Sequence, residues 1–168
     1  SSLAQAVTPF DLVIQNGRVI DPESQLDAVR SIGIRDGRVA AISNKPLDAA
    51  QVIDAAGLVV SPGFINLHSH SAAEAGYRLE LLDGVTTVLE LEAGTFPITR
   101  FGQQLGDAPL THFGASVGHA WIRMLVMDPQ ALSDIAATGK VDISGRAFTQ
   151  SATVEQRAQI RSMIEQEL

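Results

Sequence analysis

The stretch that decides the fold runs from Ser61 to His70 and reads SPGFINLHSH. A Pro-Gly turn precedes a short apolar run, which ends in two histidines that are one residue apart. Because side chains alternate between the two faces of a β-strand, we expect His68 and His70 to share one face. Two imidazoles on one face at a strand's end can bind a single metal ion, and neutral imidazole is a common metal ligand. The alternative is a pair of exposed or hydrogen-bonded histidines at the end of a strand.

The composition is that of a globular protein and limits its partners. The chain has 168 residues, of which 45% are hydrophobic and 18% are charged, so it can form an ordinary domain with a core. The net charge of −7 argues against a nucleic-acid partner. No apolar run approaches the roughly 18 residues that a membrane-spanning helix requires. Because cysteine is absent, any metal must be bound by histidine and carboxylate side chains.

The first residues contain a pattern that is typical of signal-peptide cleavage sites. Ala4-Gln5-Ala6 matches the Ala-x-Ala motif that precedes such a cut. The motif predicts a periplasmic or secreted protein. The alternative is a chance alanine-rich tail in a cytoplasmic protein.

Residues 11–60 alternate short apolar runs with tight turns and show no helical period. Turns are predicted at Asn16-Gly17, Asp36-Gly37 and Ala56-Gly57, each between two apolar runs. The pattern predicts three hairpins in an all-β module. Short antiparallel pieces of this kind need a partner sheet to bury one face.

After Pro62 the pattern changes to alternating strands and helices. We expect strands over 64–70, 85–92 and 112–119, helices over 72–82, 98–105 and part of 121–138, and a loop over 139–150 with a short extended piece at 141–143. The strand over 85–92 begins apolar on both faces, which is typical of a parallel strand covered by helices. Residues 62–168 are therefore predicted to form three strand-helix units.

The last segment is predicted to be an amphipathic helix. Thr153 and Gln156 have the spacing of a capping box, and Ile160, Met163, Ile164 and Leu168 fall on one face. The helix is still amphipathic where the chain stops, and a barrel of this architecture needs eight strands. We therefore expect the N-terminal part of a longer enzyme. The alternative is a complete small open α/β sheet.

Three successive strands are predicted to end in groups that can bind a cation. His68 and His70 end the first strand, Glu90 and Glu92 the second, and His119 the third. In parallel sheets and barrels, ligands gather at the carboxyl ends of the strands. Two carboxylates buried side by side would be costly without a cation. The alternative for the glutamates is a solvated strand end.

Each candidate residue can be given a role on this basis. Glu92 is the first choice for a ligand that bridges two ions, and Glu90 for a partner that orients a histidine. A metal would lower the pKa of a bound water and polarise a carbonyl. His119 is expected over the substrate, and Arg123 is expected to bind a carboxylate with its planar guanidinium. The alternatives are that His119 is a core histidine and that Arg123 is a surface charge.

The order of these segments resembles the amidohydrolase superfamily. The residues that carry the resemblance are Pro62–His70 after a β-module and the strand start Gly84–Val88, which reads GVTTV. Gly118-His119, Arg123 and the closing helix are most similar to the N-acyl-D-amino-acid deacylases (D-aminoacylases). The resemblance extends from about residue 11 to the end of the chain.

The resemblance implies an α/β fold with an incomplete (β/α)₈ TIM barrel. Residues 62–168 would supply its first three βα units, preceded over residues 1–61 by a tail and part of a small β-sandwich. His68 and His70 fall on the first metal-ligand pair of the family. The second strand of D-aminoacylases supplies a cysteine ligand, where this chain has Glu92-Ala93, so a carboxylate would take its place. The catalytic aspartate and the later histidines would lie beyond Leu168, so no catalytic residue is expected within this chain.

The leading functional prediction is a metal-dependent hydrolase of a linear amide bond, with an N-acylated amino acid as substrate. One or two divalent ions are expected, with zinc as the first choice. The remainder of the polypeptide or a second chain would complete the barrel, and a homo-oligomer stays open. The alternatives are a cyclic-amide hydrolase of the dihydroorotase or hydantoinase type, and a non-catalytic relative that serves binding or assembly.

Overall fold

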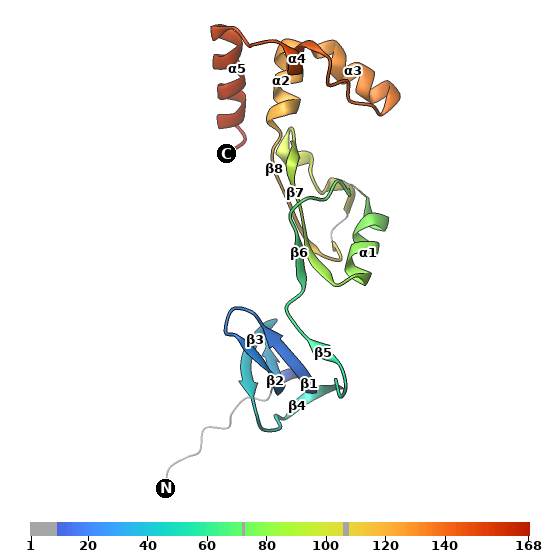
Figure 1. Ribbon diagram of the computed structural model, residues 1–168, viewed down its shortest axis with the longest axis vertical. Coiled ribbons are helices and arrows are strands. Elements are labelled where there is room, and N and C mark those ends of the chain that lie inside the picture. The colour runs from blue at the N-terminus through green and yellow to red at the C-terminus, as the bar shows by residue number, and fades with distance from the viewer. Residues whose placement is uncertain (1–9, 72, 106–107) are drawn as a thin grey trace. The chain divides into compact units, whose positions relative to one another are not determined.

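The computed structural model describes residues 10–71, 73–105 and 108–168, which form a mixed α/β structure (Figure 1). They divide into two compact units, one that ends at Pro62 and one that begins at Gly63. The predicted cleavage motif Ala4-Gln5-Ala6 lies outside the described residues. Within the described part of the chain, no helix has the length and apolar character to cross a membrane.

The first unit is a five-stranded sheet organised around its first strand. The strands are β1 (Phe10–Asp21), β2 (Leu26–Arg35), β3 (Arg38–Ser43), β4 (Ala49–Asp54) and β5 (Val59–Val60). β1 pairs antiparallel with β2 and parallel with both β4 and β5. β3 extends the sheet beyond β2. Val13, Val19 and Ile32 are buried on this sheet.

One of the three predicted hairpins is confirmed. Asp36 and Gly37 join β2 to β3, and their φ angles of 51° and 69° are those of a tight hairpin turn. The hairpin predicted at Ala56-Gly57 is wrong, because β4 and β5 pair with β1 and not with each other.

The hairpin predicted at Asn16-Gly17 is also wrong, because β1 continues through both residues. Asn16 has a φ of 64°, and the register with β2 shifts between Ile14 and Gly17, so the two residues form a bulge. A Cβ atom on Gly17 would lie 2.6 Å from Cγ2 of Val60. Gly17 is therefore required for the close approach of β5 to β1. The sequence Asn-Gly alone does not distinguish this requirement from that of a hairpin turn.

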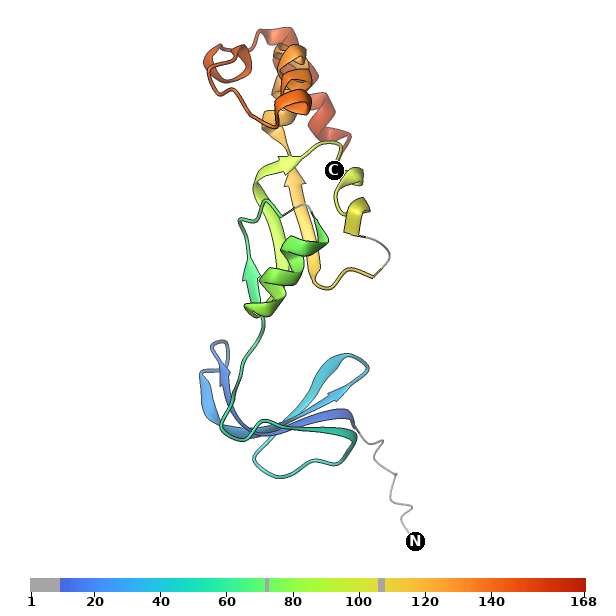
Figure 2. The ribbon, with the colours of Figure 1, turned by 90° about the vertical axis from the view of Figure 1, so that its right-hand side faces the viewer.

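The second unit contains a three-stranded parallel sheet with helices along it and beyond it. Its strands are β6 (Phe64–Asn66), β7 (Val85–Thr95) and β8 (His112–Val117), in that order. The helices are α1 (Glu74–Leu82), α2 (His119–Met127), α3 (Pro129–Thr138), α4 (Arg146–Thr149) and α5 (Val154–Glu165). Figure 2 shows α1 alongside the strands and α2 to α5 beyond the carboxyl end of β8.

Several predicted bounds in this unit require correction. β6 ends at Asn66, so His68 and His70 lie in the segment that follows it. β8 ends at Val117, and His119 is the first residue of α2. The predicted helix over 98–105 is two 3₁₀ turns, η1 (Ile98–Arg100) and η2 (Gln103–Leu105). Gly102, with a φ of 82°, separates them and interrupts any continuous helix.

The end of the chain follows its prediction more closely. The capping box of Thr153 and Gln156 is present, and α5 packs Ile160 into a core with Ile122 and Met124 of α2. Leu168, predicted on the same face, is 93% exposed beyond the end of the helix. The stretch 139–150, predicted as a loop, contains α4, and its residues 141–143 are not a strand.

Gly94 is the backbone position in this unit that we expect to tolerate substitution least. Its φ is 62°, and a Cβ atom would lie 2.6 Å from the carbonyl oxygen of Ser116. We expect Gly94→Ala to lower the free energy of unfolding by about 1–3 kcal/mol, because left-handed strain and a backbone clash coincide. Urea denaturation followed by the fluorescence of Trp121 measures this, since Trp121 Nε1 donates to the Gly94 carbonyl at 3.1 Å.

Gly139→Ala is the matched control. Gly139 has a φ of 69°, and no atom lies within 4 Å of its Cβ position. The control therefore measures the cost of the left-handed backbone strain without the clash. Equal losses for the two variants would contradict the crowding argument at Gly94.

Candidate metal centre

The two histidines are presented by a segment that is anchored to the neighbouring strand. The backbone N–H of Ser69 donates to the carbonyl oxygen of Leu89 in β7 at 3.1 Å. The backbone N–H of His68 donates to Oδ1 of Asn66 at 3.1 Å, which turns the chain at the end of β6. Ser69 is buried, at 6% exposure, while both histidine side chains are exposed. The segment thus directs the side chain of Ser69 into the protein and the two imidazoles toward solvent.

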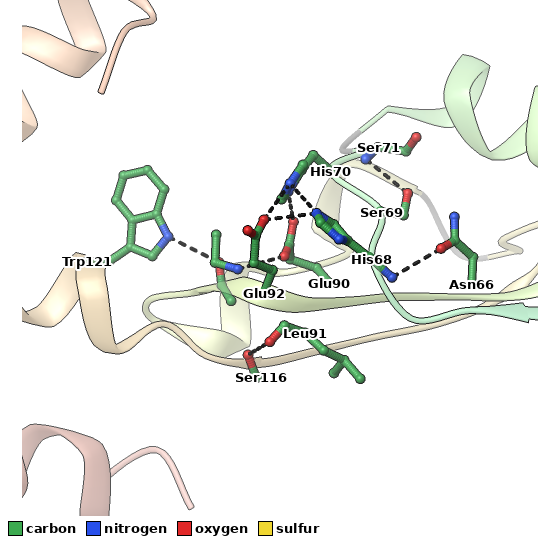
Figure 3. A network of polar contacts seen from close by, with 12 residues as sticks. Asn66, His68, Ser69, His70, Ser71, Glu90, Leu91, Glu92, Ser116 and Trp121 are labelled. Atoms are coloured by element: carbon green, nitrogen blue, oxygen red, sulfur yellow. Dashed lines mark hydrogen bonds and ion pairs between the residues drawn. The ribbon is translucent and has the colours of Figure 1, made fainter. Parts of the chain in front are cut away.

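Three possible ligand atoms converge at this point. His68 Nε2 and His70 Nε2 lie 3.2 Å apart, and they lie 2.9 Å and 3.0 Å from Oε2 of Glu92 (Figure 3). We considered groups of three or more histidine, cysteine, aspartate or glutamate side chains whose ligand atoms all lie within 4.8 Å of one another. Among the described residues, His68, His70 and Glu92 are the one such group.

The spacing of these atoms fits a single cation. A tetrahedral cation with bonds of about 2.0–2.1 Å holds its ligand atoms about 3.3 Å apart, close to the separations observed. Two imidazole nitrogens and a carboxylate oxygen all carry lone pairs, so they repel one another at this distance unless a proton or a cation lies between them. Two histidines and one carboxylate are also a ligand set that zinc accepts.

Glu90 lies behind this group and holds His70. Its Oε2 accepts a hydrogen bond from Nδ1 of His70, and its Oε1 accepts from the backbone N–H of Ala93 at 3.1 Å. The bond to Nδ1 directs the lone pair of Nε2 toward His68 and Glu92, as in carboxylate–histidine–metal arrangements. The hydrogen bond and the charge of Glu90, with a smaller effect of Glu92, raise the pKa of His70 above its ordinary value. Glu90 is buried, at 8% exposure.

A second carboxylate, Glu80 of α1, contacts the inward side of the same segment. Its Oε1 accepts from the hydroxyls of Ser69 at 2.5 Å and Ser71 at 3.1 Å. Its Oε2 accepts from Nδ2 of Asn66 at 3.0 Å. Sequence reasoning did not identify Glu80. The available signal was the alternation of Ser69 and Ser71 with the histidines, which places two hydroxyls on the face opposite to the imidazoles.

Glu80 predicts how the stability of this unit depends on pH. Burial raises the pKa of its carboxyl group, but the hydrogen bonds from Ser69, Asn66 and Ser71 outweigh burial and lower the pKa below its ordinary value of 4.5. A lowered pKa in the folded state contributes stability that is present above the ordinary value and is lost as the pH falls through the lowered one. The stability difference between the wild type and Glu80→Gln should therefore shrink as the pH falls below 4.5. Urea denaturation at neutral and acidic pH measures this, and a difference that does not change with pH would contradict it.

The structure does not bring His119 and Arg123 to the three ligand atoms. His119 opens α2 and lines a groove of about 600 Å³ beside α5, together with Arg123 and Arg161. Arg123 donates from Nε and Nη2 to the carbonyl oxygen of Ala147 at 2.9 and 2.8 Å, and from Nη2 to that of Gln150 at 3.1 Å. Its guanidinium thus contacts the α4 segment, and its predicted contact with a substrate carboxylate stays a prediction.

A small cavity lies beside His70 and Glu90. Its volume is about 240 Å³, and Arg100 and Phe101 are also among its lining residues. Sequence analysis did not single out Arg100, because the stretch around it was predicted to be an ordinary helix. The structure instead places Arg100 at the end of η1, where it lines the same cavity as His70 and Glu90.

Comparisons with known proteins find relatives in sequence and in fold. No family model matches the chain. Allantoinase from Escherichia coli O1:K1 / APEC is 39% identical over 99 residues, which are 54% of this chain and 21% of allantoinase. The solved structure of N-acyl-D-glutamate deacylase from Bordetella bronchiseptica, in complex with zinc and a phosphonate inhibitor, has a TM-score of 0.64 and 24% identity, over 96% of this chain and 36% of that one. A solved D-aminoacylase, described with a binuclear metal centre, has a TM-score of 0.68 and 23% identity, over 94% of this chain and 36% of that one.

The described residues therefore have the fold of the amidohydrolase superfamily, as the sequence resemblance predicted. Within that superfamily the fold is D-aminoacylase-like. The chain spans about a fifth of the length of allantoinase and about a third of each of these solved structures.

Proposed function

We propose that the protein containing this chain is a metal-dependent hydrolase of a linear amide bond, and that it deacylates an N-acyl amino acid of D configuration. The observation that carries the proposal is the convergence of His68 Nε2, His70 Nε2 and Glu92 Oε2 at mutual distances of 2.9–3.2 Å. The D-aminoacylase-like fold supports the linear substrate.

The residues of this chain would hold the cation and leave the remaining chemistry to other parts of the protein. His68, His70 and Glu92 would bind a divalent ion, with zinc as the first choice. When bound, such an ion polarises a carbonyl group and makes a water more acidic. Glu90 would keep the proton of His70 on Nδ1, so that Nε2 stays a ligand. Glu92 contacts both imidazoles through Oε2, which leaves Oε1 for a second ion. The groups that transfer protons would lie outside this chain.

The cavity beside His70 supports a substrate that carries a carboxylate. Arg100 lines this cavity together with Glu90, and a planar guanidinium binds carboxylates in a bidentate manner. An N-acyl amino acid has a carboxylate next to the amide that is cleaved. The uncharged ring of a hydantoin does not, whereas dihydroorotate does, so this cavity disfavours a hydantoinase and leaves a dihydroorotase to the experiment.

A cyclic-amide hydrolase is the second candidate, and one observation favours it. The similarity to allantoinase reaches 39% identity, above that to either D-aminoacylase-like structure, although it covers 54% of the chain. The metal-binding residues would serve either reaction, so the substrate has to be determined by experiment.

We further propose that residues 62–168 form the first three βα units of a (β/α)₈ barrel, and that residues 1–61 supply an N-terminal tail and part of a β-sandwich. Phe64 and Ile65 on β6 are 65% and 62% exposed, which is unusual for apolar strand residues and would be relieved by further strands. The remainder of the polypeptide or a second chain would supply them. We also retain export as a proposal, on the Ala4-Gln5-Ala6 motif.

A substrate panel tests the proposed function. The full-length protein, loaded with zinc, is assayed for amine release from N-acetyl-D-amino acids and their L enantiomers, and for ring opening of hydantoin, allantoin and dihydroorotate. We expect release from the D series, its loss on chelation, its recovery with zinc, and a raised KM for the free acid in Arg100→Gln. Ring opening alone would favour the second candidate. The absence of both hydrolysis and bound metal would contradict both enzymes and favour a non-catalytic relative.

A further inference from the structure

We infer that Glu80 of α1 is a positioning residue of the metal centre, which holds residues 66–71 in the shape that brings the two imidazoles together. This inference rests on the proposed metal-binding role of His68 and His70. Glu80 touches neither imidazole in the contacts described for it, so it acts through the side chains and backbone of the segment between them.

The first connection runs from Glu80 to the backbone of His68. Oε2 of Glu80 accepts from Nδ2 of Asn66 at 3.0 Å, and Oδ1 of Asn66 accepts from the backbone N–H of His68 at 3.1 Å. The amide of Asn66 is thus oriented at both ends. It transmits the position of α1 to the point where the chain leaves β6.

The second connection fixes both neighbours of His70. Oε1 of Glu80 accepts from the hydroxyls of Ser69 and Ser71, and Oγ of Ser69 also accepts from the backbone N–H of Ser71 at 3.2 Å. Figure 3 shows Asn66, Ser69 and Ser71 on the side of the histidines away from Glu92. The segment is therefore held from behind, and the imidazoles stay free for the cation.

The network requires a carboxylate at position 80. Three donors converge on Glu80, and Asn66 has to present its amide N–H because its carbonyl oxygen is occupied by His68. A glutamine offers one oxygen where the glutamate offers two. In Glu80→Gln, either the amide of Asn66 or the buried hydroxyl of Ser69 therefore loses its acceptor.

One double variant should restore the network. In the double variant Asn66→Asp/Glu80→Gln, the glutamine oxygen can accept from both serines and its amide can donate to the aspartate. The second aspartate oxygen still accepts from the backbone of His68. Asn66→Asp alone places two carboxylates at the 3.0 Å contact and should disturb the segment as Glu80→Gln does.

The experiment measures cobalt(II) binding by the full-length apoprotein of the wild type, of Glu80→Gln, of Asn66→Asp and of the double variant. The affinity and the visible spectrum of the bound ion are recorded for each. We expect each single variant to lose about tenfold in affinity and to change the spectrum, as loss of supporting contacts behind metal ligands does. The double variant should return to within about threefold of the wild type with the wild-type spectrum. Glu74→Gln is the control, because Glu74 is an exposed residue of the same helix that pairs with Arg78 at 3.6 Å. Circular dichroism checks that each variant folds.

The outcomes separate this inference from the proposed function. If the wild type binds cobalt and Glu80→Gln binds it equally tightly with the same spectrum, the positioning role is wrong and the metal centre stands. If the double variant stays as weak as the single ones, the hydrogen-bond pattern is not what Glu80 supplies, and the inference is again wrong. If the wild type binds no metal at all, both the proposed function and the positioning role fail.

Discussion

His68→Ala is expected to lower the affinity of the full-length protein for zinc by more than about a hundredfold, because losing a ligand should cost more than losing a supporting partner does. Two of the three converging atoms would remain, Nε2 of His70 and Oε2 of Glu92, at 3.0 Å from each other. Hydrolysis should fall in parallel and should not recover when zinc is added at concentrations that saturate the wild type. Competition with a chromophoric chelator measures the affinity.

The variant is expected to fold normally, so the loss can be assigned to the site. The side chain of His68 is 63% exposed, and its removal creates no cavity in the core. His112→Ala is the matched control, because His112 is an exposed histidine at the start of β8, outside the group of converging ligands. Equal zinc affinity in His68→Ala and the wild type would contradict the assignment of the site.

Glu92→Gln is expected to reduce zinc affinity more than Glu90→Gln. The two residues lie two positions apart on β7, and the two substitutions are chemically identical. Glu92 contributes the atom that faces both imidazoles, at 2.9 and 3.0 Å, so its charge acts directly on the cation. Glu90 acts through Nδ1 of His70, and loss of such a partner costs about tenfold to a hundredfold in metal affinity.

The free energy of unfolding, in contrast, should fall more in Glu90→Gln than in Glu92→Gln. The side chain of Glu90 is 10% exposed and that of Glu92 is 61% exposed. Glu90→Gln offers one acceptor oxygen where the carboxylate accepts from both His70 Nδ1 and the backbone N–H of Ala93, so one donor loses its acceptor, whereas Glu92→Gln changes a solvated group. Zinc titration and urea denaturation of both variants measure the two orders. A larger zinc effect for Glu90→Gln would show that the assignment of the two roles is reversed.

The parallel sheet and the histidine pair could be predicted because their signals are local. The apolar run before Leu67, the strand that begins with Val85 and the spacing of His68 and His70 each lie within a few residues of sequence. The capping box of α5 is local in the same sense. Placing Glu90 and Glu92 beside the histidines required one additional rule, that parallel strands end on the same side of their sheet.

The features that were missed depend on contacts between distant segments. Glu80 lies 14 residues from Asn66, and only the packing of α1 against β7 brings its carboxylate behind the histidine segment. Asn16-Gly17 has the composition of a hairpin turn, but β4 and β5 pair with β1 and keep it continuous. The contacts of the Arg123 guanidinium with the carbonyl oxygens of Ala147 and Gln150, 24 and 27 residues away, are also non-local, and its substrate role stays a prediction.

The most direct measurement is anomalous diffraction at the zinc edge on crystals of the full-length protein loaded with zinc. The account predicts a peak bonded to Nε2 of His68, Nε2 of His70 and a carboxylate oxygen of Glu92, at distances of about 2.0–2.2 Å. A zinc peak bonded to other residues, with these three side chains directed to solvent, would contradict it.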